Sequence, residues 1–529
     1  MNRKQSIVML ALAVAFATGC RKHHRAVTTY HYDNLRTGWN SEEETLTPSA
    51  VSSPRFGLIH SVTLDDQVDT QPLVVPDEKL TSGPYSGQQH DVVYVATEHN
   101  TIYAIDASSG VVLLSPNFGS PVPLPLNCGN NGPDVGIDGT PVIDRESQTM
   151  YVIIYTLEAG GPIYRLHALD LGSLKDKMPP MVVAASHTLS NGSTFKFDAR
   201  FQRQRPALLA SHGNIYAGFG SFCDFRADVS RGWVLGWQAG SLTPLAANQL
   251  NDTQSASPDT FFLSSVWMSG YGISADAEGD LYFVTGNSDY SGTTYSPPAD
   301  VQESVVKVSP DLVHLRSIFT PFDVKSLEQA DNDYGSGGVV LLALQPGPKP
   351  RLAAAAGKNG RMYLLNRDSL GGFTPGGPDN VVGLVNIGGC WCGQSYFSDG
   401  TGHVASSGGA NVSVWRVAMS PSVTLIHEGT SPGIGGGQDP GFFTSVSSDD
   451  AKGAIIWAVS RPDNPSPANV ALFAFSAKPS GGGSTLSTLF HGTAGAWPNT
   501  GGNANIVPVV ANSHVYVASN KQLTIFGLH

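Results

Sequence analysis

A pair of apolar strands that recurs eight times is the feature that most restricts what this chain can fold into. Each copy has an alternating apolar run, a short turn and a second such run, which is the pattern of two adjacent antiparallel strands. The second strands begin near residues 102, 164, 233, 305, 361, 413, 471 and 523, so one unit takes 52 to 72 residues. The predicted pairs are 92–96 with 102–106, 150–154 with 163–170, 215–218 with 233–237, 281–285 with 305–308, 352–356 with 361–366, 403–406 with 413–417, 455–459 with 471–475, and 515–518 with 523–526.

A unit of this length holds four short strands, and a lone four-stranded sheet has two apolar faces that only stacking on neighbours can bury. The repeat therefore predicts an all-β fold, an eight-bladed β-propeller of four-stranded antiparallel blades, with inner strands such as 139–144 and 506–510. The eighth unit ends one strand short at His529, and we expect residues 55–62 to supply that strand and close the ring. Two sandwiches or a β-solenoid require shorter repeats or a break in composition that this chain lacks.

Composition agrees with this fold and excludes one class of partner. The 529 residues include 59 Gly and 35 Pro, which is typical of many turns between short strands, and only 14% of residues are charged. The net charge of -12 argues against nucleic acid as a partner, because phosphate backbones bind basic surfaces. We expect a monomer.

The N-terminus has the pattern of an export signal. Arg3 and Lys4 precede an apolar run, 7–16, that is too short to cross ~30 Å of hydrocarbon, and small residues follow it. Cys20 directly after Ala-Thr-Gly resembles a bacterial lipoprotein processing site, which implies lipidation there and a membrane partner through the anchor. An ordinary secreted protein is the alternative. We therefore expect a signal peptide at 1–19, a polar tether and lead-in segment at 20–50 and the propeller at 51–529, in the periplasm or at the outer-membrane face.

The other four cysteines, which can form up to two disulfides in an oxidising compartment, are Cys128, Cys223, Cys390 and Cys392. Their pairing cannot be read from the sequence. The Cys-Trp-Cys run at 390–392 fits either a local redox loop or a disulfide to another loop. The sequence contains no Cys-x-x-Cys-His, so we expect no covalently attached haem.

Three segments resemble the pyrroloquinoline-quinone (PQQ) dehydrogenase superfamily, the quinoprotein alcohol dehydrogenases. Residues 357–368, Gly-Lys-Asn-Gly-Arg-Met-Tyr-Leu-Leu-Asn-Arg-Asp, are similar to the family signature Lys-Asn-Gly-x-x-Tyr-x-Leu-Asp-Arg. Residues 281–287, Leu-Tyr-Phe-Val-Thr-Gly-Asn, resemble its Tyr-Phe-Gly-Thr-Gly-Asn. Thr-Pro-Phe-Asp at 320–323 and Asp-Asn-Asp-Tyr-Gly at 331–335 are similar to its Thr-Pro-x-Asp and Trp-Asp-x-Asp segments.

The resemblance implies a PQQ cofactor with calcium, and roles for five residues. Lys358 would contact the quinone, Asn287 would bind calcium and Asp331 would be the general base. Trp267 would lie under the cofactor, two residues from the family's register. Where the family has a calcium-binding Glu, this chain offers Asp224 or Asp228, and the family's vicinal Cys-Cys is absent.

These residues also have ordinary structural interpretations. Lys-Asn-Gly is a good hairpin turn, and Asn287 and Asp331 fit strand ends or Asx-turns. Arg203 and Arg205 could meet an anionic ligand, but surface ion pairs are the favoured interpretation. Fold alone does not determine function.

Three functions remain open from the sequence. The favoured one is an envelope lipoprotein that binds a ligand or an envelope protein partner and carries a degraded quinoprotein site. It is similar in this respect to the non-catalytic propeller lipoprotein of the outer-membrane β-barrel assembly machinery. The alternatives are an active PQQ- and calcium-dependent alcohol or sugar dehydrogenase, and a propeller that binds carbohydrate or peptide in its funnel.

Overall fold

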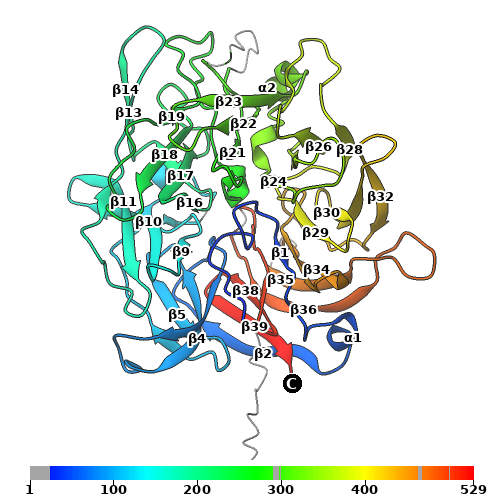
Figure 1. The fold of residues 1–529 in the computed structure, drawn as a ribbon. Helices are drawn as coiled ribbons and strands as arrows, with labels where there is room; N and C mark the ends of the chain where they lie inside the picture. The colour runs from blue at the N-terminus through cyan, green and yellow to red at the C-terminus, as the bar shows by residue number, and fades with distance from the viewer. Residues whose placement is uncertain (1–23, 131, 290–296, 298, 463–467, 500) are drawn as a thin grey trace, which may run out of the picture.

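The computed structural model describes residues 24–130, 132–289, 297, 299–462, 468–499 and 501–529, and these form a ring of eight sheets (Figure 1). Predicted features before His24, Cys20 among them, lie outside the described residues. The fold predicted from the repeat, an eight-bladed β-propeller, is confirmed. No helix in the described part of the chain is both long and apolar enough to cross a membrane.

The first four blades follow one another along the chain, each with its first strand nearest the ring centre. Their strands are, for blade 1, β3 (Leu73–Lys79), β4 (Gln89–Ala96), β5 (Ile102–Asp106) and β6 (Val112–Leu114); for blade 2, β9 (Val142–Asp144), β10 (Thr149–Glu158), β11 (Gly161–Asp170) and β12 (Met181–Val182); for blade 3, β15 (Gln202–Gln204), β16 (Leu209–Ser211), β17 (Asn214–Ser221), β18 (Trp233–Gln238) and β19 (Gln249–Leu250); and for blade 4, β20 (Ser274–Ala275), β21 (Leu281–Val284), β22 (Val305–Val308), β23 (Leu315–Thr320) and β27 (Gly372–Phe373).

The other four blades complete the ring and use two strands from the N-terminal region. They are, for blade 5, β24 (Val339–Leu341), β25 (Leu352–Ala356), β26 (Arg361–Asn366) and β28 (Gly383–Asn386); for blade 6, β29 (Ser395–Ser398), β30 (Gly402–Ser406), β31 (Ser413–Ala418) and β32 (Thr424–Thr430); for blade 7, β1 (Trp39–Asn40), β33 (Thr444–Asp449), β34 (Lys452–Val459), β35 (Asn469–Ser476) and β36 (Thr488–Ala496); and for blade 8, β37 (Val509–Ala511), β38 (His514–Ser519), β39 (Gln522–Leu528) and β2 (Phe56–Thr63).

All eight predicted strand pairs are present, because the apolar alternation that defines them is the alternation that buries each blade against its neighbours. Strands also occur between the predicted pairs. Residues 373–400 contain β28, the half-buried outer strand of blade 5. Residues 184–204 contain a hairpin of β13 (Ser186–Thr188) and β14 (Thr194–Lys196).

The two ends of the chain close the ring, as predicted. Strand β2 pairs antiparallel with β39, with Phe56 opposite Leu528 and Thr63 opposite Gln522. Behind this seam, Phe56 packs on Trp457 and Phe490, with ring centroids 5.7 and 4.8 Å apart. Because blade 8 is built from both ends, neither end is left as a free sheet edge.

The N-terminal segment from Val27 to Asn40 differs from the predicted tether, because it runs through the centre of the ring (Figure 1). It forms a hydrogen bond with the innermost strand of every blade. The contacts are Val27–Val74, Thr28–Ile143, Asn34–Ala210, Asn34–Ala275, Leu35–Leu341, Thr37–Tyr396, Gly38–Val446, and both Tyr32 and Asn40 to Val510. Innermost strands have one unpaired backbone edge, and this segment pairs with it.

Arg36 is the best-buried charge in this segment, with no exposed surface. Its guanidinium donates to the carbonyl oxygens of Ile273, Tyr30 and Leu208 at 2.8 to 3.0 Å, and to the hydroxyl of Thr29. Burial lowers the pKa of Arg36 to about 10, which leaves it charged at neutral pH. Arg36 thus connects the segment to blades 3 and 4.

We predict that Arg36→Met lowers the free energy of unfolding by about 3 kcal/mol or more, because three buried carbonyl groups and a hydroxyl lose their donor. Urea unfolding of both proteins measures the difference. Arg55→Met is the control, since Arg55 is exposed and its side chain donates to the carbonyl of His529 at the surface. Equal losses in the two variants would contradict the role assigned to Arg36.

Candidate functional site

A cavity of about 680 Å³ lies where loops from blades 3 to 8 converge. Four of the five residues that the resemblance implied line it: Asp224, Trp267, Asp331 and Lys358. The fifth, Asn287, lies directly behind Asp331 and donates to its carboxylate at 3.4 Å. The fold therefore brings together residues that are far apart in the sequence.

Lys358 stands in the turn between β25 and β26, and its ammonium group is the centre of the site. Its Nζ lies 2.9 Å from Asp333 and 3.2 Å from Asp331, and it also donates to the Asp331 carbonyl at 3.1 Å. Burial alone lowers the pKa of Lys358, but the two carboxylates outweigh burial and raise it above its ordinary value. Gly360 has φ +76, and a Cβ there would lie 2.9 Å from the backbone of Gly388, which explains the Lys-Asn-Gly turn.

Two indole rings flank this ammonium group. The ring centroid of Trp267 lies 5.8 Å from Lys358 Nζ, and that of Trp391 lies 5.4 Å from it. Both distances are within cation–π range. Trp267 thus lines the cavity despite its shifted register. Trp391 was not assigned a role from the sequence, although its place between two cysteines marked it as unusual.

The cysteines support this arrangement. Cys390 pairs with Cys392, so the Cys-Trp-Cys loop is closed on itself and not joined to another loop. Two backbone carbonyl oxygens of this loop accept hydrogen bonds at 2.7 Å. That of Cys390 accepts from the Ser336 hydroxyl, and that of Trp391 accepts from the Arg461 guanidinium. The second disulfide joins Cys128 to Cys223 beside Asp224.

The acidic side chains at the site differ in how much of their surface is exposed to solvent. Asp331, the implied general base, is 61% exposed at its side chain, whereas Asp333 is 5% exposed and is the stronger partner of Lys358. Burial, and then the charge of Asp333, raise the pKa of Asp224 to about 6, and Ser221 donates to it at 2.8 Å. Asp228, the alternative to Asp224, lies outside the cavity in a surface pair with Arg226.

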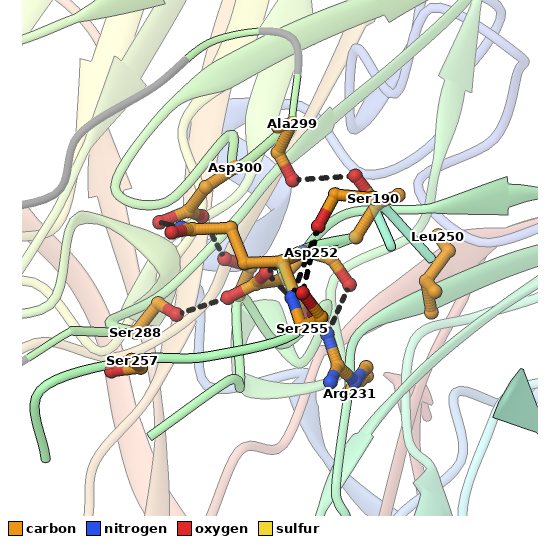
Figure 2. A network of polar contacts seen from close by, with 12 residues as sticks. Ser190, Arg231, Leu250, Asp252, Ser255, Ser257, Ser288, Ala299 and Asp300 are labelled. Atoms are coloured by element: carbon orange, nitrogen blue, oxygen red, sulfur yellow. Dashed lines mark hydrogen bonds and ion pairs between the residues drawn. The ribbon is translucent and has the colours of Figure 1, made fainter. Parts of the chain in front are cut away.

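A polar network fixes the loop that carries Asn287. Figure 2 shows Ser288 donating to Asp252 at 2.7 Å, with Arg231 3.5 Å from the same carboxylate and Asp300 close by. The backbone N–H of Ser288 also donates to Glu328 at 3.0 Å. These groups are buried, so the network fixes Ser288, the residue after Asn287.

Two buried arginines also line the cavity. Arg203, in β15, and Arg205, directly after that strand, are only 4% and 9% exposed, so the expectation of surface ion pairs is wrong. Arg203 donates to Asp138 at 2.7 Å, while its Nη2 is buried without a partner among the described atoms. Arg461, behind Trp391, is a third buried arginine that no sequence signal marked, and burial lowers its pKa to about 9.

A planar anion fits the described residues better than calcium does. Two arginines and Lys358 supply cations, and Trp267 offers a ring face. Calcium would need these carboxylates as ligands, but the ammonium of Lys358 already lies between Asp331 and Asp333. The one group of three acidic or metal-ligating side chains that the described structure brings within ligand distance of one another lies elsewhere and includes none of the implied calcium ligands.

Comparisons with known proteins support the fold and leave the activity open. No family model and no curated protein matches the sequence. A quinohemoprotein alcohol dehydrogenase from Pseudomonas putida HK5 superposes with a TM-score of 0.62 at 14% identity, over 95% of this chain and 80% of that one. A europium-containing methanol dehydrogenase gives 0.58 at 14% identity, over 95% and 98%. BamB from Moraxella catarrhalis reaches only 0.31, which is too low to support an argument.

The chain therefore has the eight-bladed propeller fold of the PQQ quinoprotein alcohol dehydrogenases. At this identity the likeness establishes architecture, and the chemistry has to be argued from the residues of the cavity.

We predict that Lys358→Met lowers the free energy of unfolding at pH 7 by about 3 kcal/mol, because Asp333 stays buried without its cation. Adding Asp333→Asn should recover part of the loss. Chemical denaturation measures both effects. Lys478→Met is the matched control: Lys478 is 67% exposed and pairs with Asp399 at 2.6 Å, so its loss should be below about 1 kcal/mol.

Proposed function

We propose that this protein is an exported propeller that binds a planar anionic molecule in its central cavity, with PQQ the first candidate, and that its quinoprotein site is degraded. The observation that carries the proposal is the position of Lys358 Nζ, which is held by two carboxylates beside Trp267 and Trp391 in a cavity that Arg203 and Arg205 also line.

The chemistry of these side chains supports a carboxylated ring compound. Carboxylates pair best with guanidinium groups, which offer parallel donors, and Arg203 has a buried donor to spare. An indole face stacks on a flat ring and excludes water from one side of it. The volume of about 680 Å³ lies within the range of small-molecule pockets.

An active dehydrogenase is the second candidate, because Lys358, Asn287 and Asp331 lie together as the resemblance implies. Bound PQQ supplies a two-electron acceptor for alcohol oxidation. In that case the exposed carboxylate of Asp331 would accept the proton of the substrate hydroxyl. The ammonium between Asp331 and Asp333 argues against the calcium that this chemistry requires, so we rank binding first.

The test is a titration of the purified protein with PQQ, with and without calcium, followed by melting temperature and absorbance. We expect saturable stabilisation without calcium, lost in Lys358→Ala and kept in Lys478→Ala, because a ligand that binds the native state raises its stability. Calcium-dependent binding together with oxidation of alcohols or sugars by an artificial electron acceptor would favour the dehydrogenase. Absence of any PQQ effect at high concentration would contradict both.

Export and anchoring are part of the same proposal and rest on the N-terminal sequence. Arg3, Lys4, the short apolar run and Cys20 support a lipoprotein that reaches the cell envelope, where an envelope protein partner could bind the ring. We predict that a radiolabelled fatty acid is incorporated into the protein and that Cys20→Ser abolishes the label and releases the protein from the membrane fraction. Secretion of an unlabelled wild-type protein would contradict anchoring.

A further inference from the structure

Three carboxylates outside the central cavity lie within ligand distance of one another. Asp69 precedes β3, Glu98 follows β4, and Asp138 precedes β9, so blades 1 and 2 both contribute. One oxygen from each lies within 4.8 Å of the other two, and this is the sole such group among the residues described. The same oxygens could therefore bind one ion.

The charge of this group is balanced only in part by protein cations, the nearby Arg203 and Arg205. Glu98 and Asp138 are 1% and 3% exposed, and Asp69 is partly exposed. Asp138 is paired with Arg203 at 2.7 Å, but within the described ranges no ammonium, guanidinium or imidazole lies at ion-pair distance from Asp69 or Glu98. Burial, together with the charges of Asp138 and Asp69, raises the pKa of Glu98. Arg203 and Arg205 lie close enough to act on the group, but neither Asp69 nor Glu98 has a cation in direct contact among the described residues.

Glu98 also has an oxygen without a partner. Its Oε2 accepts the N–H of Gly136 at 2.7 Å, while Oε1 is buried and accepts no hydrogen bond from the described atoms. An unpaired buried carboxylate oxygen is costly, which indicates that a ligand belongs there. Only glycine can approach Glu98 this closely at position 136, because a Cβ there would lie 2.2 Å from the Glu98 carbonyl oxygen and 2.4 Å from the side-chain oxygen of Asn100.

The group can be reached from solvent. A second cavity of about 390 Å³ is lined by Glu98 together with Gln67, Gly132 and Asp134, and it is separate from the central cavity. An ion could enter by this route without passing the residues around Lys358.

We propose that Asp69, Glu98 and Asp138 bind a divalent cation that prefers oxygen ligands, with calcium the first candidate. Hard cations bind carboxylate and carbonyl oxygens, and calcium tolerates the irregular geometry that two adjoining loops provide. The ion supplies the direct cation contact that Asp69 and Glu98 lack among the described residues, and it joins blade 1 to blade 2. It also fixes Asp138, whose carboxylate holds Arg203 at the wall of the central cavity. The site does not depend on PQQ binding.

The test uses the purified full chain, stripped with a chelator and titrated with calcium chloride in the absence of PQQ. We expect binding at this site in calorimetry and a rise in melting temperature of roughly 2–4 °C at about 100-fold excess over the dissociation constant. Glu98→Gln should weaken binding at least roughly 10-fold, since affinity follows the charge of the ligand set. Asp331→Asn, in the central cavity, should leave it unchanged.

Two results would overturn the proposal. If Asp331→Asn removes calcium binding while Glu98→Gln keeps it, the ion binds in the central cavity. The second result is that calcium has no effect on the wild type and the Glu98→Gln variant melts at a higher temperature than the wild type. In that case the three carboxylates share a proton and bind no ion. Asp69→Asn serves as the second variant if Glu98→Gln does not fold. PQQ is absent throughout, so failure here leaves the proposed ligand of the central cavity untouched.

Discussion

The constraint on which the rest of the structure depends is the hydrogen bonding of the segment 27–40 to the innermost strands of all eight blades. Its backbone bonds to six blades, and the side chains of Asn34, Tyr32 and Asn40 bond to blades 3 and 8. In a propeller each blade packs only on its neighbours, and the innermost strands have one backbone edge that no neighbour satisfies. The segment bonds to these edges, and the guanidinium of Arg36 donates to three backbone carbonyl groups, two of which, at Leu208 and Ile273, adjoin blades 3 and 4. The centre of the ring is therefore solid, and the functional cavity forms above it from loops.

Buried apolar side chains and buried charged side chains lie in different parts of this molecule. The sheets bury apolar side chains between blades, while charged groups collect around the axis, where Arg203, Asp333 and Lys358 are all nearly inaccessible. Charges in such a place are stable only when they are paired or bind a ligand. Within the described part of the chain, the Nη2 of Arg203 and the Oε1 of Glu98 are among several buried charged atoms without a hydrogen-bond partner, and these two lie beside cavities.

The sequence predicted the blades well because the strand period and the burial of each blade have the same origin. It missed β28 because this strand is short and half exposed, so that its apolar alternation is weak. It treated Arg203 as a surface residue because charged residues are exposed by default. The implied site residues were brought together as the resemblance required, but Trp391, Asp333 and the third arginine, Arg461, could not be assigned from local sequence.

The sequence alone determined the eight-unit repeat, the four-stranded blades and the seam between the two chain ends, because each depends on apolar periodicity that is local to a strand. Only the tertiary structure decided that residues 27–40 fill the ring centre, that Lys358 lies between Asp331 and Asp333, and that Asp69, Glu98 and Asp138 meet. These contacts join blades that are distant along the chain. These contacts form only when the ring closes, and a local pattern of residues does not predict how the ring closes.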